Sequence, residues 1–253
     1  MFLDISYTGW AIGMLAALSV GLGKGGLPGA GNLSVALMAT VFAGKESVGI
    51  LLPVLICADI AAVIVYHQHA RWGQLLRLLP WTLVGIAIGA VIFKRIDDTL
   101  LVRAIGAILL LMVGLRFTVS WFQKEKEGAV FHNPMGRRLF VAFSGIMGGI
   151  ATMVANAAGP VVTIYLMVAK LPKYEFIGTS AWFFFLINLS KMPVQVGIGN
   201  ITWHSLRISM IFGVVAFGAA MVAPKIVRYL PQKVFSFLLW VLVVVAGLKM
   251  LLS

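Results

Sequence analysis

Charged and polar side chains are rare within the long apolar stretches of this chain. Asp59 lies in one such stretch, and Asn188 lies at the matching place in another, with Lys191 one helical turn beyond it. A charge near the centre of a bilayer costs about 2.5–3.5 kcal/mol on insertion scales, so such residues normally face a cavity or a partner. Two interpretations of Asp59 carry equal weight: a structural ion pair with Lys24 or Lys191, and a role in proton coupling or gating together with Asn188 and Lys191.

Two glycine-rich stretches could bind an anion through the backbone. The first runs over 21–32 and the second over 152–160. Glycine lets a backbone approach a ligand closely, and a helix that starts after such a stretch presents free N–H groups and a partial positive charge. The substrate-binding residues that we expect from these stretches are Lys24, Gly25, Gly26, Gly29, Gly31, Asn32, Asn156, Ala157 and Gly159.

Some of these residues could instead have a structural role. Lys24 adds a full positive charge to an anion site if its stretch enters the membrane, whereas in a surface turn it would snorkel to the interface. Asn156 and Asn188 could equally be hydrogen-bonding residues between helices.

Other kinds of chemistry find little support in the sequence. The single cysteine, Cys57, cannot form an intrachain disulfide, and His67 and His69 have no cysteine or carboxylate cluster beside them that would favour a metal. There are no paired carboxylates, nucleophile elbow, P-loop or dinucleotide-binding glycine motif. We therefore expect neither an enzyme nor a bound cofactor.

The composition indicates which elements position these residues. Hydrophobic residues make up 61% of the chain and charged residues 11%, so a soluble fold would have too little polar surface. Apolar runs of about twenty residues recur, enough to cross about 30 Å of hydrocarbon as helices, and they do not alternate as barrel strands do. We predict an all-α integral membrane protein. Its net charge of +12 falls mostly between the runs, which fits lipid headgroups rather than nucleic acid.

A polar linker over 123–137 divides the apolar segments into two sets of five. The linker carries mixed charge, as solvated segments do. The chain thus divides into a first membrane repeat over 1–122, the linker, and a second membrane repeat over 138–253. The predicted segments are 8–23, 30–43, 48–66, 75–93, 99–122, 138–155, 158–169, 175–198, 204–223 and 232–252.

Matching residues recur in the same order in both halves. An odd number of segments per half sends the second half into the membrane from the opposite side, which is the inverted-repeat architecture of many secondary transporters. The matches are Ala30-Gly31 with Ala158-Gly159, Lys45-Glu46-Ser47-Val48-Gly49 with Tyr174-Glu175-Phe176-Ile177-Gly178, Trp72 with Trp203, and Gly114-Leu115-Arg116 with Gly247-Leu248-Lys249.

Each half also contains a segment too short to span. As helices, 30–43 and 158–169 would extend only about 21 and 18 Å, and each follows one of the glycine-rich stretches. Broken stretches at matching places in two halves are the best sequence indication of a transporter site. We predict one re-entrant or broken hairpin per repeat, with both tips near the midplane.

The basic residues predict the orientation. The loops after the third, fifth, seventh and ninth segments carry about twice as many as the opposite loops, which places the linker in the cytoplasm and both termini outside. The richer side has Arg71, Arg77, Lys124, Lys126, Arg137, Arg138, Lys170, Lys173, Lys225, Arg228 and Lys233, and the poorer side chiefly Lys45, Lys94, Arg95, Arg103, Arg207 and Lys249.

The glycine-rich stretches and the repeat around them resemble the TauE/SafE family of membrane anion transporters. The likeness covers essentially the whole chain, with Lys24 and Asn156 standing where the family commonly has a glycine run. The residues that carry it are Gly21-Leu22-Gly23-Lys24-Gly25-Gly26 with Pro28, Gly145-Ile146-Met147-Gly148-Gly149, Ala157-Ala158-Gly159-Pro160, Lys45-Glu46-Ser47-Val48-Gly49 and Gly178-Thr179-Ser180.

This resemblance implies transport of sulfur-containing anions, such as sulfite, sulfoacetate or other organosulfonates, across a bacterial cytoplasmic membrane. We expect a multi-pass secondary transporter working by alternating access, with a small anion as substrate, protons as a candidate coupling ion and the bilayer as its surroundings. A passive anion channel and a non-transporting membrane assembly subunit are the alternatives. Nucleic acid is not an expected partner, and a homodimer is compatible with the sequence.

Overall fold

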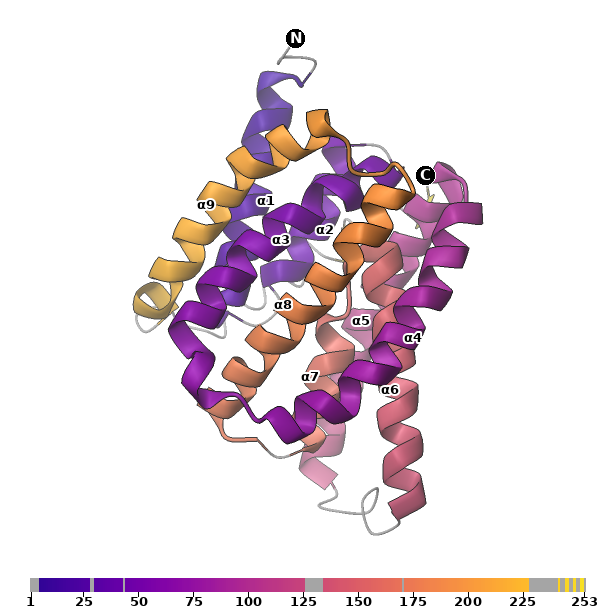
Figure 1. The fold of residues 1–253 in the computed structure, drawn as a ribbon, viewed down its shortest axis with the longest axis vertical. Helices are drawn as coiled ribbons and strands as arrows, with labels where there is room; N and C mark the ends of the chain where they lie inside the picture. Colours follow the sequence, from indigo (N-terminus) through magenta and orange to yellow (C-terminus); the bar gives the residue numbers. More distant parts are fainter. Residues whose placement is uncertain are drawn as a thin grey trace.

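The described part of the chain is helical. The computed structural model describes residues 5–27, 30–42, 44–125, 134–169 and 171–227, with a few single positions beyond, and this part contains no strand. The prediction of an all-α fold is confirmed. The helices, shown in Figure 1, are α1 Tyr7–Lys24, α2 Ala30–Val41, α3 Gly44–Tyr66, α4 Trp72–Arg95, α5 Asp98–Glu125, α6 Pro134–Ala155, α7 Gly159–Val168, α8 Lys173–Gly197 and α9 Trp203–Val227, with a short 3-10 turn, η1, at His67–His69.

The helix lengths fit a membrane protein. Four helices in the described part are long and apolar enough to cross a bilayer, and they lie within α3 with η1, α4, α6 and α9. By contrast, α2 has 12 residues and α7 has 10, so they reach only about 18 and 15 Å. These two short helices are the ones that the sequence predicts to be too short to span.

Two predicted boundaries differ from the structure. The polar linker predicted at 123–137 is partly helical, because α5 continues to Glu125 and α6 already begins at Pro134. Its charged residues can extend a helix into water as readily as they can form a loop. Residues 126–133 and most of the predicted tenth segment, 232–252, lie outside the described residues.

Large apolar side chains cover the outside of the bundle. On α9, Val214 is 70% exposed, on α6 Phe143 is 66% exposed, and on α5 Leu111 is 58% exposed. In water this surface would favour aggregation, whereas in a bilayer it contacts lipid at no cost.

Helices α3 and α8 lie side by side across the centre of the molecule and run in opposite directions (Figure 1). Gly49, early in α3, lies where a Cβ atom would be 2.5 Å from the carbonyl oxygen of Asn200, just after α8. Gly178, early in α8, would likewise place a Cβ atom 2.7 Å from the carbonyl oxygen of Tyr66, at the end of α3. Each helix therefore packs its first turns closely against the end of the other.

The outer helices pack across the two halves. Helix α4 packs on α6, and α9 packs on α1 and α3. Both contacts depend on small residues: a Cβ atom on Gly149 of α6 would lie 2.2 Å from the carbonyl oxygen of Thr82 in α4, and one on Gly21 of α1 would lie 2.4 Å from that of Ala216 in α9. The backbones of these pairs thus touch almost directly, as small residues allow in membranes.

Candidate functional site

Helix α1 ends in a glycine turn that places Lys24 in its last turn. The N–H of Leu27 donates to the carbonyl of Leu22 at 3.0 Å, and Gly26, with a φ of 116°, donates to Gly23 at 3.4 Å. This is the Schellman arrangement, in which a left-handed glycine stops the helix and an apolar residue packs back on it. The turn thereby leaves Lys24 facing the centre of the molecule.

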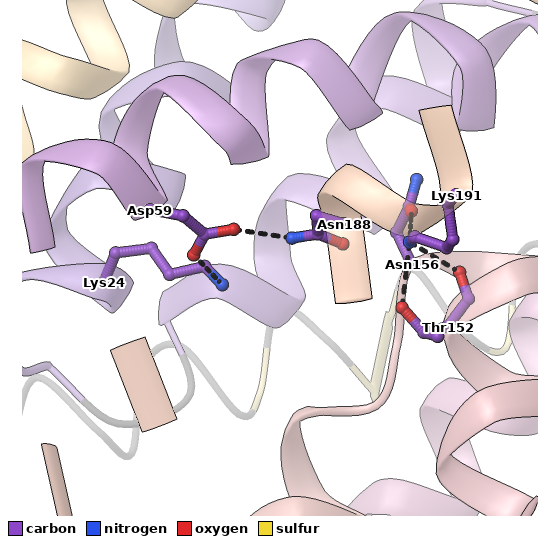
Figure 2. A network of polar contacts seen from close by, with 6 residues as sticks. All are labelled: Lys24, Asp59, Thr152, Asn156, Asn188 and Lys191. Carbon is purple, nitrogen blue, oxygen red and sulfur yellow. Dashed lines mark hydrogen bonds and ion pairs between the residues drawn. The ribbon is translucent and has the colours of Figure 1, made fainter. Parts of the chain in front are cut away.

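Lys24 meets Asp59 of α3. Its Nζ lies 2.6 Å from Asp59 Oδ1 and 3.9 Å from the centroid of the Phe184 ring. Asp59 is fully buried, and its Oδ2 accepts a hydrogen bond from Asn188 Nδ2 of α8 at 2.6 Å (Figure 2). Of the two interpretations offered for Asp59, the ion pair with Lys24 is present, while coupling or gating stays a prediction. Asn188 links α8 to α3, and its own Oδ1 is buried without a hydrogen-bond partner in the described part.

Lys191 lies one turn further along α8 and is fully buried. Its Nζ donates to Thr152 O at 3.1 Å, to Thr152 Oγ1 at 2.9 Å and to Asn156 Oδ1 at 2.7 Å (Figure 2). An ammonium group has three N–H donors, so all of them are used. All three acceptors are neutral, and no carboxylate among the described residues lies within ion-pair distance of this ammonium.

The end of α6 suits a cation. Thr152 O is one of the last carbonyls of the helix, where the negative end of the helix dipole favours positive charge. Asn156 follows with a φ of 53°, a left-handed conformation that asparagine adopts more readily than most residues. Its Nδ2 donates to the carbonyl of Val48 at 3.0 Å, so this one side chain links α6 to both α8 and α3.

The two hairpin tips meet beside this cluster. Asn32 Oδ1, near the start of α2, lies 3.5 Å from the place of a Cβ atom on Gly159, the first residue of α7. The tip of the first hairpin is tight, because a Cβ atom on Gly23 would lie 2.6 Å from the N of Gly31. Among the described residues, no atom lies within 4 Å of the place of a Cβ atom on Gly31, so a ligand could approach its backbone there. The two tips thus lie close together, while the prediction that they form one central anion site near the midplane stays a prediction.

Some of the predicted site residues have a structural role in this region. The position of a Cβ atom on Gly25 is only 2.2 Å from the Cβ of Ala223 in α9, so Gly25 serves close helix packing there. Gly26 supplies the left-handed turn, and Ala157 is buried at 2% exposure. Gly29 lies outside the described residues. Their part in anion binding stays a prediction.

Thr152 and Tyr66 belong to the cluster but were not among the predicted site residues. Thr152 supplies two of the three acceptors around Lys191, and Tyr66 donates its hydroxyl to the carbonyl of Gly25 at 3.2 Å. A signal for Thr152 is present in the repeat, since it stands 128 residues after Lys24, the spacing that separates Gly31 from Gly159.

A second polar group lies at one end of α3 and α8. Arg71 forms an ion pair with Glu175, and its backbone N–H donates to Thr179 Oγ1 at 2.9 Å. The hydrogen bond and the charge of Glu175 raise the pKa of the Arg71 guanidinium. The pair borders an open pocket of about 620 Å³ that is also lined by Gln74 and Arg77. At the opposite end of the two helices, Asn200 Nδ2 donates to Gln195 Oε1 at 2.7 Å.

Comparison with known proteins identifies a family. The family model described as Sulfite exporter TauE/SafE matches residues 12–250, nearly the whole chain. No match was found among the curated proteins or among the solved structures.

Proposed function

Because the chain belongs to the TauE/SafE family of sulfite exporter-type membrane transporters, we propose that it carries small sulfur-containing anions, such as sulfite, sulfoacetate or other organosulfonates. The proposed membrane is the bacterial cytoplasmic membrane, with the termini outside. The mechanism is secondary transport by alternating access, in which the site opens to each side in turn.

The buried ammonium of Lys191 is the observation that supports this proposal most. It lies at the end of α6, where the second hairpin begins, and its hydrogen bonds within the described part of the chain all go to neutral oxygens. Hydrogen bonds to a charged acceptor are roughly twice as strong as those to a neutral one, so an anionic oxygen can replace the Asn156 amide on this ammonium. The N-termini of α2 and α7, which approach each other at Asn32 and Gly159, would add backbone donors to an anion held between them.

Lys24 and Asp59 take a supporting role in this proposal. Their ion pair cancels the charge that Lys24 would otherwise add to the anion site. Asp59 can still accept a proton when the pair separates during the transport cycle, and this is the proposed route for proton coupling. Asn188 holds the carboxylate in place on the α8 side.

The pairs α4 with α6 and α1 with α9 are the proposed moving parts. Their close backbone contacts at Gly149 and Gly21 favour motion of each pair as one body. The antiparallel helices α3 and α8 lie between the pairs and carry Asp59, Asn188 and Lys191. Rocking of the pairs about α3 and α8 would expose the site to each side.

A flux experiment tests the proposal. Purified protein in proteoliposomes is assayed with methanesulfonate, sulfoacetate, sulfite, sulfate and acetate, with and without a pH gradient. We expect saturable flux of one or more of the sulfur-containing anions, and a fall of at least about tenfold in that flux in Lys191→Gln, because a charged hydrogen bond is lost. Lys94→Gln, an exposed lysine at the end of α4, is the matched control.

Three other results of the flux experiment would contradict the proposal or favour an alternative function. Full sulfonate flux in Lys191→Gln would contradict the assignment of the anion site. Flux that ignores the pH gradient and does not saturate would indicate a passive channel. No flux from the purified, folded protein would indicate a subunit of a larger membrane assembly.

A further inference from the structure

The buried charges at the centre of the molecule do not cancel. Lys24 and Asp59 form a pair at 2.6 Å, which leaves the ammonium of Lys191 as the excess charge among the described residues of this cluster. Two further titratable side chains of α3 lie close by: Tyr66 donates its hydroxyl to the carbonyl of Gly25, next to Lys24, and Cys57 stands two residues before Asp59. Both are ordinarily uncharged. The parts of α6 and α8 that face it contribute Thr152, Asn156 and Asn188.

An excess charge in a buried site determines which ligand charge fits best. Three neutral oxygens compensate an ammonium only in part, because burial removes its hydration and only an opposite charge restores neutrality. One negative charge would make the site neutral. A ligand with two negative charges would leave one of them uncompensated in the same low-dielectric surroundings.

We infer that this site selects among the sulfur-containing anions by charge and takes monoanions, such as methanesulfonate or hydrogensulfite, in preference to dianions such as sulfate and sulfoacetate. The inference rests on the proposed function and specifies its substrate class. Asp59 sets the selected charge: it removes the charge of one of the two lysines from the balance, so that one positive charge remains for the ligand.

Substitutions can change the balance by one charge at a time. Asp59→Asn keeps the size and one oxygen of the side chain but leaves both lysine charges for the ligand, so the preferred ligand becomes a dianion. The double variant Lys24→Met/Asp59→Asn returns to one excess positive charge and is its matched control. Asn188→Asp changes the balance in the other direction, because a second carboxylate cancels the charge of Lys191.

The experiment measures binding of sodium methanesulfonate and sodium sulfate to the full chain in detergent at constant ionic strength, by calorimetry. Methanesulfonate is a monoanion and sulfate a dianion throughout the working pH range. We expect the wild type to favour methanesulfonate by at least about tenfold, Asp59→Asn to reverse the ratio, and the double variant to restore it. If Asp59→Asn does not fold, Asn188→Asp carries the test, with binding of both anions expected to fall by at least about tenfold.

Equal affinities in the wild type, or the same ratio in a folded Asp59→Asn, would overturn the charge rule and leave the proposed transport function standing. An Asn188→Asp variant that binds methanesulfonate as well as the wild type would also overturn it. If the folded wild type binds neither anion, the proposed function fails together with the rule.

Discussion

Removal of either partner of the Lys24–Asp59 pair leaves the other charge buried without compensation. Breaking a buried pair in this way costs about 3–5 kcal/mol, whereas replacing both partners by neutral residues of similar size is often close to neutral. We therefore expect Lys24→Met and Asp59→Asn to lower the thermal unfolding temperature clearly, and the double variant to recover most of the loss. Differential scanning fluorimetry of the purified proteins in one detergent measures this.

The exposed pair Arg71–Glu175 provides a control for that cycle. Water and salt screen a surface pair, so Arg71→Gln and Glu175→Gln should each change the unfolding temperature much less than Lys24→Met. If the decreases in unfolding temperature of Lys24→Met and Asp59→Asn add up in the double variant, the ion pair does not stabilise the fold.

The sequence predicts some of these residues better than others. Asp59 and Lys191 are conspicuous because a charge within an apolar helix needs a partner. Thr152 is not, since a threonine in a membrane helix is common and can bond to its own backbone. The carbonyl of Val48, which accepts from Asn156, has no sequence signature at all, because every residue carries one.

At the scale of the helices, close crossings at glycines determine how near two helices can approach each other. A Cβ atom on Gly149 would lie 2.2 Å from Thr82 O and 2.7 Å from Gly85 Cα, both backbone atoms that cannot rotate away. We expect Gly149→Ala to separate α6 from α4 and to destabilise the protein by about 1–3 kcal/mol. Chemical or thermal unfolding compared with the wild type measures the change.

Gly148, the neighbouring residue on α6, is the matched control. A Cβ atom there would lie 3.6 Å from Val161 Cγ1 and 3.9 Å from Val161 Cβ, which are ordinary contact distances. Gly148→Ala should therefore be neutral or slightly stabilising, since alanine favours a helix more than glycine does. If Gly148→Ala and Gly149→Ala changed the stability equally, close contact between α4 and α6 would not be the cause of the loss in Gly149→Ala.

The sequence predicts the short helices better than their neighbours. The lengths of α2 and α7 follow from where apolar runs meet glycine and proline, which is local information. The packing of α4 on α6 and of α9 on α1 is not local. Glycine at Gly149 or Gly21 indicates that some helix approaches closely, but it does not identify which one.

For the whole molecule, composition predicts the class of fold, and the basic residues predict its orientation. The test uses cysteines at the two ends of α4 in a Cys57→Ser background. We expect Lys94→Cys to react with a membrane-impermeant maleimide in intact cells and Gly73→Cys to react only after the cells are opened, because the positive-inside rule places the Gly73 end in the cytoplasm. Both residues are at exposed positions of the helix. The reverse labelling would invert the proposed topology.

The uncompensated ammonium of Lys191 also has a consequence for turnover. A carrier whose loaded centre is neutral reorients at little electrostatic cost, whereas the empty centre would carry a positive charge through the same motion. The return of the empty carrier then becomes the slow step. If a second anion binds on the far side, the centre is neutral again before the carrier returns, and the slow return of the empty carrier is avoided. The protein would therefore work faster as an exchanger of one anion for another than as a one-way pump.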